Sequence, residues 1–283
     1  MAGFTNFATL SYNGGTTNSN IVTGEILEAL TAVKTAVSAN YSAGDRITYA
    51  LSLVNTGTTA ITDYTVTDDL GGYTVGTNTV YPLAYNAGTA RYYINGVLQT
   101  APTVTAGPPL TVTGLTVPAG GNAVLIYETT ATSVAPLATG DSITNTATIT
   151  GGGLTNTITA QATVETANSA DLTISKALSP TTVTENGQIT YTFVISNTGN
   201  TEATAADNVV VTDTFAPILR NIAVTYNGTA WTEGTNYTYN TATGVFTTLA
   251  GQITVPAASF TQNTDGTFTV TPGTTTLVIT GTV

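Results

Sequence analysis

The chain has 283 residues, of which 41% are hydrophobic and only 7% charged, with a formal net charge of −11 and neither cysteine nor histidine. Its five lysine and arginine residues are too few for a nucleic-acid interface or a cationic membrane-surface helix. Without cysteine there are no disulfides, and without histidine the commonest general base and metal ligand is lacking. We therefore expect no enzyme, no cofactor, no metal and no small-molecule substrate.

The chain begins with a strand-like segment that is repeated later. Residues 4–10 read FTNFATL and residues 143–149 read ITNTATI, and each segment is followed by a glycine turn. The later copy ends a repeat, whereas the first copy has no repeat before it to close. The first ten residues also lack the basic and apolar regions of a secretion signal. The first copy is therefore predicted to be a strand that completes another domain.

Two repeats follow this segment. LTAVKTAVSANYSAGDRITYALSLVNTG from Leu30 matches LTISKALSPTTVTENGQITYTFVISNTG from Leu172, and the repeats continue into TVTD ending at Asp68 and VVVTD ending at Asp213. The alternation and the turn spacing predict short antiparallel strands in a β-sandwich. GEILEALTAVK could form a short helix, but its match ETANSADLTISK is strand-like, so we expect a linker and a strand there.

Only the first repeat continues into a closing strand, at ITNTATIT; the second stops at Val283. We predict a donor segment at residues 1–28, a β-sandwich domain at 29–166 and a second at 167–283 that lacks its last strand or strands. An unpaired sheet edge is unstable and sticky. Donating residues 4–12, with or without 17–28, to the next copy would build a head-to-tail filament. Insertion into the chain's own second domain is the alternative, and it would reverse the order of the array.

The chain has two lysines, Lys34 and Lys176, at matching positions of the two repeats. Strand alternation places both on apolar faces, so they are predicted to point into the core, where a lone ammonium is costly. The same alternation predicts that Asp68 and Asp213 also point into the core. It also predicts that the asparagines of the two closing strands point inward. The residues that share the inward face are Phe4, Asn6, Ala8 and Leu10 in the first copy and Ile143, Asn145, Ala147 and Ile149 in the second.

This set of residues suggests a specific reaction. A buried lysine is driven towards its neutral, nucleophilic amine and a buried carboxyl towards its protonated form. We predict an amide bond between Lys34 and Asn145, assisted by Asp68. A second bond would join Lys176 to Asn6 of the next subunit, assisted by Asp213. The unreactive alternative is a buried Lys–Asp ion pair with a hydrogen-bonded asparagine.

Two other groups of residues are weaker candidates for a binding site. Asp63, Asp68 and Asp69 do not have the spacing of a calcium-binding loop. Trp231 and the tyrosines of residues 236–239 could bind a glycan, but cross-strand pairs on a hairpin are the better explanation.

The run SK-x-LSPTTVTENGQITYTFVISNTGN…VVVTDTF…TNTATIT resembles a repeat domain of unknown function from bacterial surface proteins, related to the isopeptide-forming modules of Gram-positive adhesins and pili. The resemblance implies an immunoglobulin-like sandwich and supports the lysine, asparagine and aspartate roles given above. A two-repeat chain of this size is also similar to the structural subunits of clostridial spore appendages. We therefore expect a self-assembling fibre subunit on an extracellular surface, whose partner is a further copy of itself. The alternative is an adhesin that binds glycan or matrix.

Overall fold

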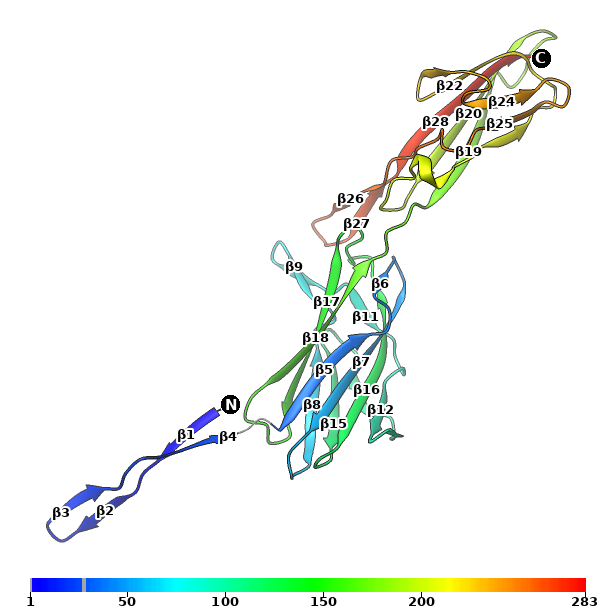
Figure 1. Ribbon diagram of the computed structural model, residues 1–283. Helices are drawn as coiled ribbons and strands as arrows, with labels where there is room; N and C mark the ends of the chain where they lie inside the picture. The colour runs from blue at the N-terminus through cyan, green and yellow to red at the C-terminus, as the bar shows by residue number, and fades with distance from the viewer. Residues whose placement is uncertain (1, 27–28) are drawn as a thin grey trace. The chain divides into compact units, whose positions relative to one another are not determined.

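The computed structural model describes residues 2–26 and 29–283 (Figure 1). The chain divides into two compact units, residues 1–135 with 142–165 (unit 1) and residues 136–141 with 166–283 (unit 2). The predicted all-β fold is confirmed, because the regular elements among the described residues are all strands apart from one 3-10 turn, η1 (Ala205–Asp207). The predicted boundaries after residues 28 and 166 stay predictions. No helix in the described ranges has the length and apolar character to cross a membrane.

Unit 1 contains two larger sheets and a separate small hairpin. The strand order of the first sheet is β13 (Val97–Leu98), β12 (Arg91–Ile94), β16 (Asn122–Ala131), β7 (Arg46–Asn55) and β5 (Leu30–Ala36), with β11 (Leu83–Tyr85) also on β16. The order of the second sheet is β14 (Thr103–Thr105), β15 (Leu110–Val117), β8 (Ile61–Asp68), β17 (Ser142–Gly151), β18 (Ile158–Thr166) and β6 (Asn40–Tyr41). The hairpin pairs β9 (Tyr73–Val75) with β10 (Asn78–Val80).

The core of unit 1 follows from strand alternation. Every second residue of β7, β16 and β17 is buried, as expected for strands with one face on a core. The predicted strand at Leu30–Ala36 is confirmed, with Leu30 and Lys34 buried on one face. The short-helix alternative extended over residues 27–28, which lie outside the described residues. The closing strand predicted at ITNTATIT is β17, which pairs with β8 on one side and β18 on the other.

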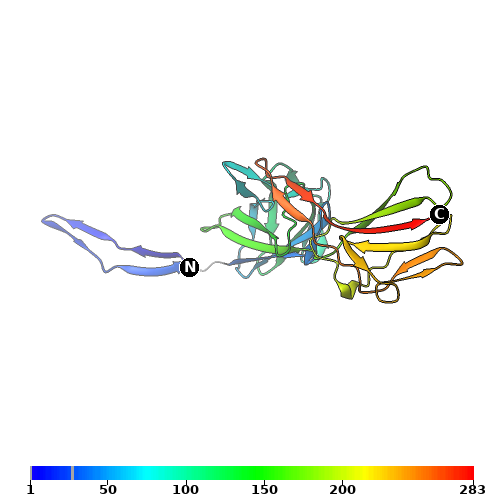
Figure 2. The same cartoon turned by 90° about the horizontal axis from the view of Figure 1, so that it is seen from above.

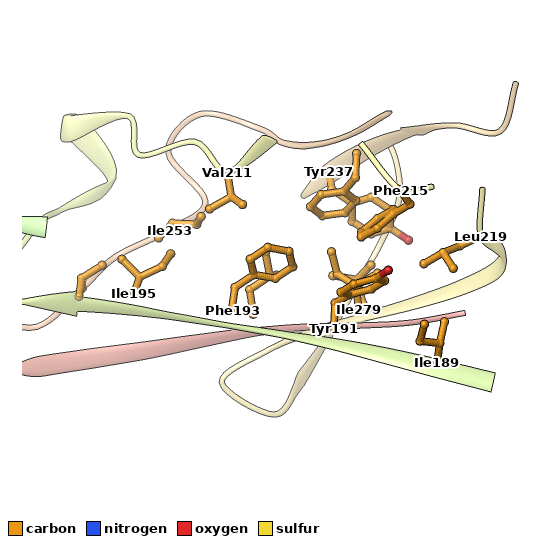
Figure 3. Packing of buried hydrophobic residues seen from close by; sticks show 14 of the residues in the cluster. Ile189, Tyr191, Phe193, Ile195, Val211, Phe215, Leu219, Tyr237, Ile253 and Ile279 are labelled. Carbon is orange, nitrogen blue, oxygen red and sulfur yellow. The ribbon is translucent and has the colours of Figure 1, made fainter. Parts of the chain in front are cut away.

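Unit 2 repeats the first sheet but has a smaller second sheet. The first sheet runs β19 (Leu172–Ser179), β20 (Gln188–Asn197), β28 (Gly273–Thr282), β22 (Arg220–Tyr226) and β23 (Thr229–Trp231). The second has only β21 (Thr212–Thr214), β25 (Val245–Thr248) and β24 (Tyr237–Asn240). β26 (Ser259–Gln262) and β27 (Phe268–Thr271) form a separate hairpin. Figure 3 shows Tyr191 and Phe193 of β20 packed in one cluster with Phe215 and Tyr237, and the Tyr191 and Phe215 rings stack at 4.9 Å.

One edge of β21 has no partner strand in the described part of unit 2. In unit 1, Asp68 of β8 pairs with Leu110 on one side and with Ala147 of β17 on the other. In unit 2, Asp213 of β21 pairs with Phe246 on one side, and no strand occupies the other. The described residues of unit 2 therefore contain no counterpart of β17 and β18. We call this side of β21, with the facing side chains of β19, the open edge.

The N-terminal segment is a long β-hairpin (Figure 2). β1 (Ala2–Asn6) pairs with β4 (Val22–Ile26), and β2 (Thr9–Tyr12) pairs with β3 (Gly15–Asn18). The register shifts by one between the two pairs, because Asn6 pairs with Val22 but Thr9 pairs with Asn18, which marks a bulge. All described side chains from residue 4 to residue 23 are exposed. Burial within unit 1 therefore does not stabilise the hairpin.

Candidate functional site

In unit 1 the predicted residues come from both sheets. Lys34 lies on β5 of the first sheet, whereas Asp68 and Asn145 lie on β8 and β17 of the second. β8 and β17 are adjacent, and Asp68 pairs with Ala147, two residues beyond Asn145 on the same face. Lys34, Asp68 and Asn145 as whole residues are 4%, 1% and 0% exposed. The sandwich therefore directs an amine, an acid and an amide into one core, as the sequence predicted.

Asp68 is the centre of the polar contacts in this core. Its Oδ2 atom lies 2.6 Å from Nζ of Lys34 and accepts a hydrogen bond from the Tyr127 hydroxyl. Its Oδ1 atom accepts a hydrogen bond of 3.1 Å from the backbone N–H of Leu70. The Lys34 ammonium also lies 4.9 Å from the ring centroid of Tyr49. This contact set fixes the carboxyl group and holds the lysine against it.

The protonation states follow from burial. Desolvation lowers the pKa of Lys34, although the Asp68 carboxyl acts in the opposite direction. Desolvation raises the pKa of Tyr49 and of Tyr127, and the nearby Asp68 carboxyl adds to both shifts. The amine is thereby made easier to deprotonate, while both tyrosine hydroxyls keep their protons and remain available as donors.

Asn145 is the least satisfied residue of the core. Neither its Nδ2 nor its Oδ1 atom has a hydrogen-bond partner. The amide does lie close enough to the hydroxyls of Tyr49 and Tyr127 to lower their pKa values slightly, against the larger raising effect of burial. Buried polar atoms without partners are rare and call for an explanation. An amide held unpaired beside an amine and a carboxyl is a set of groups that can react.

Unit 2 has the matching lysine and aspartate but in an open setting. Lys176 pairs with Asp213, and its Nζ lies 4.5 Å from the ring centroid of Tyr191, 5.4 Å from that of Phe193 and 5.5 Å from that of Phe215. The lysine side chain is 40% exposed and that of Asp213 18%. Lys176 thus points towards the core rings as predicted, but nothing in the described unit covers it.

The remaining predicted residues lie on the N-terminal hairpin. Asn6 pairs with Val22 and is exposed. The other members of the predicted donor strand are exposed as well, but they are divided between β1 (Phe4), β2 (Leu10) and the residues between these strands (Ala8). In unit 1 the corresponding pair of the closing hairpin is Asn145 with Ala162. The structure therefore does not bring Asn6 to Lys176 within the chain. Their contact between copies stays a prediction.

Three tyrosines of the site were missed by reasoning from sequence. Tyr49 and Tyr191 end the segment ITY in both repeats, so the same repetition that singled out the lysines could have identified them. Tyr127 occurs only in unit 1. It pairs with Tyr49, whereas Ile279 pairs with Tyr191 at the matching position. No sequence signal marked Tyr127, because its hydrogen bond crosses from one sheet to the other.

Comparison with known proteins places the chain beside bacterial pilins and adhesins. No protein-family model matches the sequence, and no curated protein matches it. The major pilin subunit BcpA of Bacillus cereus is similar at 14% identity and a TM-score of 0.35, over 96% of this chain and 73% of that one. The pilus backbone RrgB of Streptococcus pneumoniae is similar at 13% identity and a TM-score of 0.36, over 86% of this chain and 55% of that one.

A third similar structure is smaller. The collagen-binding domain of a Staphylococcus aureus adhesin matches at 12% identity and a TM-score of 0.30, over 49% of this chain and 99% of that domain. These proteins are of the classes that the sequence resemblance named.

Proposed function

We propose that this chain is the structural subunit of a self-assembling extracellular fibre, a spore appendage or a similar surface filament. Each subunit donates its N-terminal hairpin to the open edge of the preceding copy, and amide bonds lock both units. The observation that carries the proposal is the Lys176–Asp213 pair beside an unpaired strand edge. The matching pair in unit 1 is covered by the hairpin that contains Asn145.

The open edge has the properties of an acceptor. In the described residues β21 has no partner strand on one side, and such an edge is a template for a further strand. On β19 facing it, Ile174 is 55% exposed and Leu178 37% exposed, on the face predicted to be apolar and buried. A strand laid against β21 would cover these side chains together with Lys176. The same step would pair the backbone and bury the apolar surface.

The N-terminal hairpin has the form of the segment that is missing from the described residues of unit 2. In unit 1 the covering element is the antiparallel pair β17–β18, and β1–β4 with β2–β3 form an antiparallel pair of similar design. Phe4, Leu10 and Val22 of this hairpin are 53%, 64% and 55% exposed. An apolar hairpin without a core of its own gains stability by entering one. We infer that two strands are donated, not one.

Chain order favours donation to another copy over insertion into the same chain. β17–β18 directly precede β19, the first strand of unit 2, with residues 167–171 between them. The N-terminal hairpin precedes β5, the first strand of unit 1, with residues 27–29 between them. A closing hairpin thus completes the sandwich before it and then leads into the next. By this order the hairpin ending at Ile26 completes unit 2 of a preceding copy, which gives a head-to-tail polymer.

The proposed cross-link is the same reaction in both units. Nζ of the lysine passes a proton to the aspartate carboxylate, and the neutral amine attacks Cγ of the asparagine. The carboxyl returns this proton to Nδ2, the attacking nitrogen gives up a second proton to it, and the C–Nδ2 bond breaks. One ammonium ion is thus released for each amide formed. In unit 1 this joins Lys34 to Asn145. Between copies it joins Lys176 to Asn6, with Asp213 as the acid.

The test is polymerisation that survives boiling in denaturant. Wild-type assemblies should run on a denaturing gel as a ladder, and Lys176→Ala and Asn6→Ala should each run as monomer. Asn20→Ala, which changes another exposed asparagine of the same hairpin, should keep the ladder. Deletion of residues 1–26 should give soluble monomer. Fibres formed by that deletion would rule out hairpin donation, and monomer released from wild-type fibres would rule out the bond between copies.

A further inference from the structure

The unpaired polar atoms of the described residues gather at one place in unit 1. Four buried side-chain nitrogen or oxygen atoms in the described part of the chain have no hydrogen-bond partner. Three of these belong to two residues of the core already described, namely the hydroxyl of Tyr49 and both amide atoms of Asn145. A buried hydroxyl without a partner normally costs about 1–3 kcal/mol. A phenylalanine would fill the space of Tyr49 without that cost.

The position of Tyr49 sets it apart from the other tyrosine of the site. The Tyr127 hydroxyl is already committed to Oδ2 of Asp68. The Tyr49 ring is 0% exposed, stacks at 5.8 Å on the Tyr127 ring and lies 4.9 Å from Nζ of Lys34. Its hydroxyl lies close enough to the Asn145 amide to interact with it electrostatically. Within this core, the unpaired hydroxyl of Tyr49 thus lies beside the unpaired amide of Asn145.

We propose that Tyr49 is a catalytic residue of the Lys34–Asn145 reaction, whose hydroxyl donates to Oδ1 of Asn145 as negative charge develops there. This inference rests on the proposed function. Attack of the Lys34 amine on Cγ turns the carbonyl oxygen into an oxyanion, and the Tyr49 O–H stabilises it without giving up its proton. When the C–Nδ2 bond breaks and ammonia leaves, the carbonyl re-forms and keeps the hydrogen bond. No further reactant is needed.

Unit 2 repeats the arrangement. Tyr191 pairs with Leu178 of β19 next to Lys176, as Tyr49 pairs with Ala36 next to Lys34. Nζ of Lys176 lies 4.5 Å from the Tyr191 ring centroid. Tyr191 should therefore serve the bond between copies in the same way, once the hairpin of the next copy delivers Asn6. Tyr127 has no hydroxyl counterpart there, because Ile279 takes its place. The shared tyrosine is the one adjacent to the lysine.

The experiment follows bond formation in newly synthesised chain, by intact mass at successive times as one ammonia is lost. Tyr49→Phe removes only the hydroxyl and should slow the loss about 100-fold, the effect of deleting one oxyanion donor. Tyr64→Phe is the matched control, because its buried hydroxyl pairs with that of Tyr92 at 3.0 Å and has no contact with the reacting groups. It should leave the rate unchanged.

A purely structural role is separated by a second readout. In the Asn145→Ala background no bond can form, so thermal unfolding of this variant with and without Tyr49→Phe measures packing alone. We expect no loss of stability from Tyr49→Phe there. An unchanged reaction rate in folded Tyr49→Phe, or a stability loss in place of a rate loss, would overturn the inference while leaving the proposed function intact. If wild-type chain loses no ammonia at all, the proposed internal bond fails and the inference fails with it.

A second variant tests the inference independently if Tyr49→Phe does not fold. Tyr191→Phe should slow the growth of the denaturant-resistant ladder by a similar factor while fibres still assemble. A ladder that grows at the wild-type rate would overturn the inference for unit 2.

Discussion

Lys34 and Lys176 stand on matching strands and each contacts an aspartate, but their surroundings differ. The Lys34 side chain is 0% exposed and that of Lys176 is 40% exposed. The first sheets of the two units are alike, so the difference comes from the second sheet, where β17–β18 cover unit 1 and nothing in the described chain covers unit 2. The desolvation that activates a lysine is therefore a property of the closing hairpin, not of the repeat that holds the lysine.

The largest expected effect is a difference in stability between variants of the two copies of the closing strand. Asn145→Ala prevents a cross-link that encloses roughly 110 residues, and losing such a link should cost about 4–5 kcal/mol of unfolding free energy if the chain-entropy account of disulfides applies. Asn6→Ala alters an exposed side chain and should change the stability of the monomer by less than about 0.5 kcal/mol. Denaturant unfolding of the two monomeric variants checks this. Equal stabilities would mean that unit 1 is not cross-linked.

Alkaline pH should weaken unit 1 more than unit 2. Burial raises the pKa of four tyrosines in the described part of unit 1 and of Tyr237 in unit 2; the four are Tyr49, Tyr64, Tyr92 and Tyr127. Above pH 10 the unfolded chain loses these protons while the folded unit keeps them. Stability present below pH 10 is therefore lost as pH rises towards the raised values, by up to about 1.4 kcal/mol per pH unit for each tyrosine.

This difference can be measured in one sample. Trp231 is the only tryptophan of the chain and lies in unit 2, so its fluorescence reports on that unit, while circular dichroism reports on both. The unfolding transition seen by circular dichroism but not by Trp231 fluorescence is that of unit 1. Its melting temperature should fall more steeply above pH 10 than that of the unit 2 transition. Tyr64→Phe should reduce the slope of the unit 1 transition only. Parallel slopes for both transitions would contradict the expectation.

Amine acylation should sharpen the contrast between the lysines. In monomeric Asn145→Ala, Lys34 keeps a free but buried amine that reacts only when unit 1 opens, so Lys176 should react on the order of 100-fold faster. Peptide mass analysis after brief treatment with an acylating reagent gives both rates. In assembled fibres of Asn6→Ala, which have no bond between copies, Lys176 should become protected. Similar labelling of both lysines in the monomer would show that unit 2 is already closed.

The sequence predicted what repetition and alternation encode. The sandwich class and the inward directions of Asp68 and Asn145 follow from a two-residue period, and the structure has them as predicted. The exposure of Lys176 could not be predicted from its own strand, because burial depends on a second sheet contributed from elsewhere. The hydrogen bond of Tyr127 was equally out of reach, since it joins strands of opposite sheets. The number of hairpin strands became clear only from the pairing of β1 with β4.

The smallest expected effect concerns how the donated hairpin fits the acceptor. In the hairpin Phe4 pairs with Gly24, and its ring covers the glycine, so that a Cβ atom added there would lie 2.4 Å from Cζ of Phe4. The corresponding pair of the closing hairpin in unit 1 is Ile143 with Val164, both buried. One large and one very small side chain therefore stand where unit 1 has two of medium size.

Gly24→Val should overfill this position and weaken hairpin insertion by about 1–3 kcal/mol, which raises the concentration needed for assembly by roughly 5- to 150-fold. The double variant Phe4→Ile/Gly24→Val recreates the pair found in unit 1 and should improve assembly over the single variant, because the pair is smaller than Phe4 with Val and has the shapes that unit 1 accommodates. Light scattering against subunit concentration measures both. If Gly24→Val assembles normally, or if the double variant is no better than the single one, the Phe4 face of the hairpin does not enter a core as β17 does.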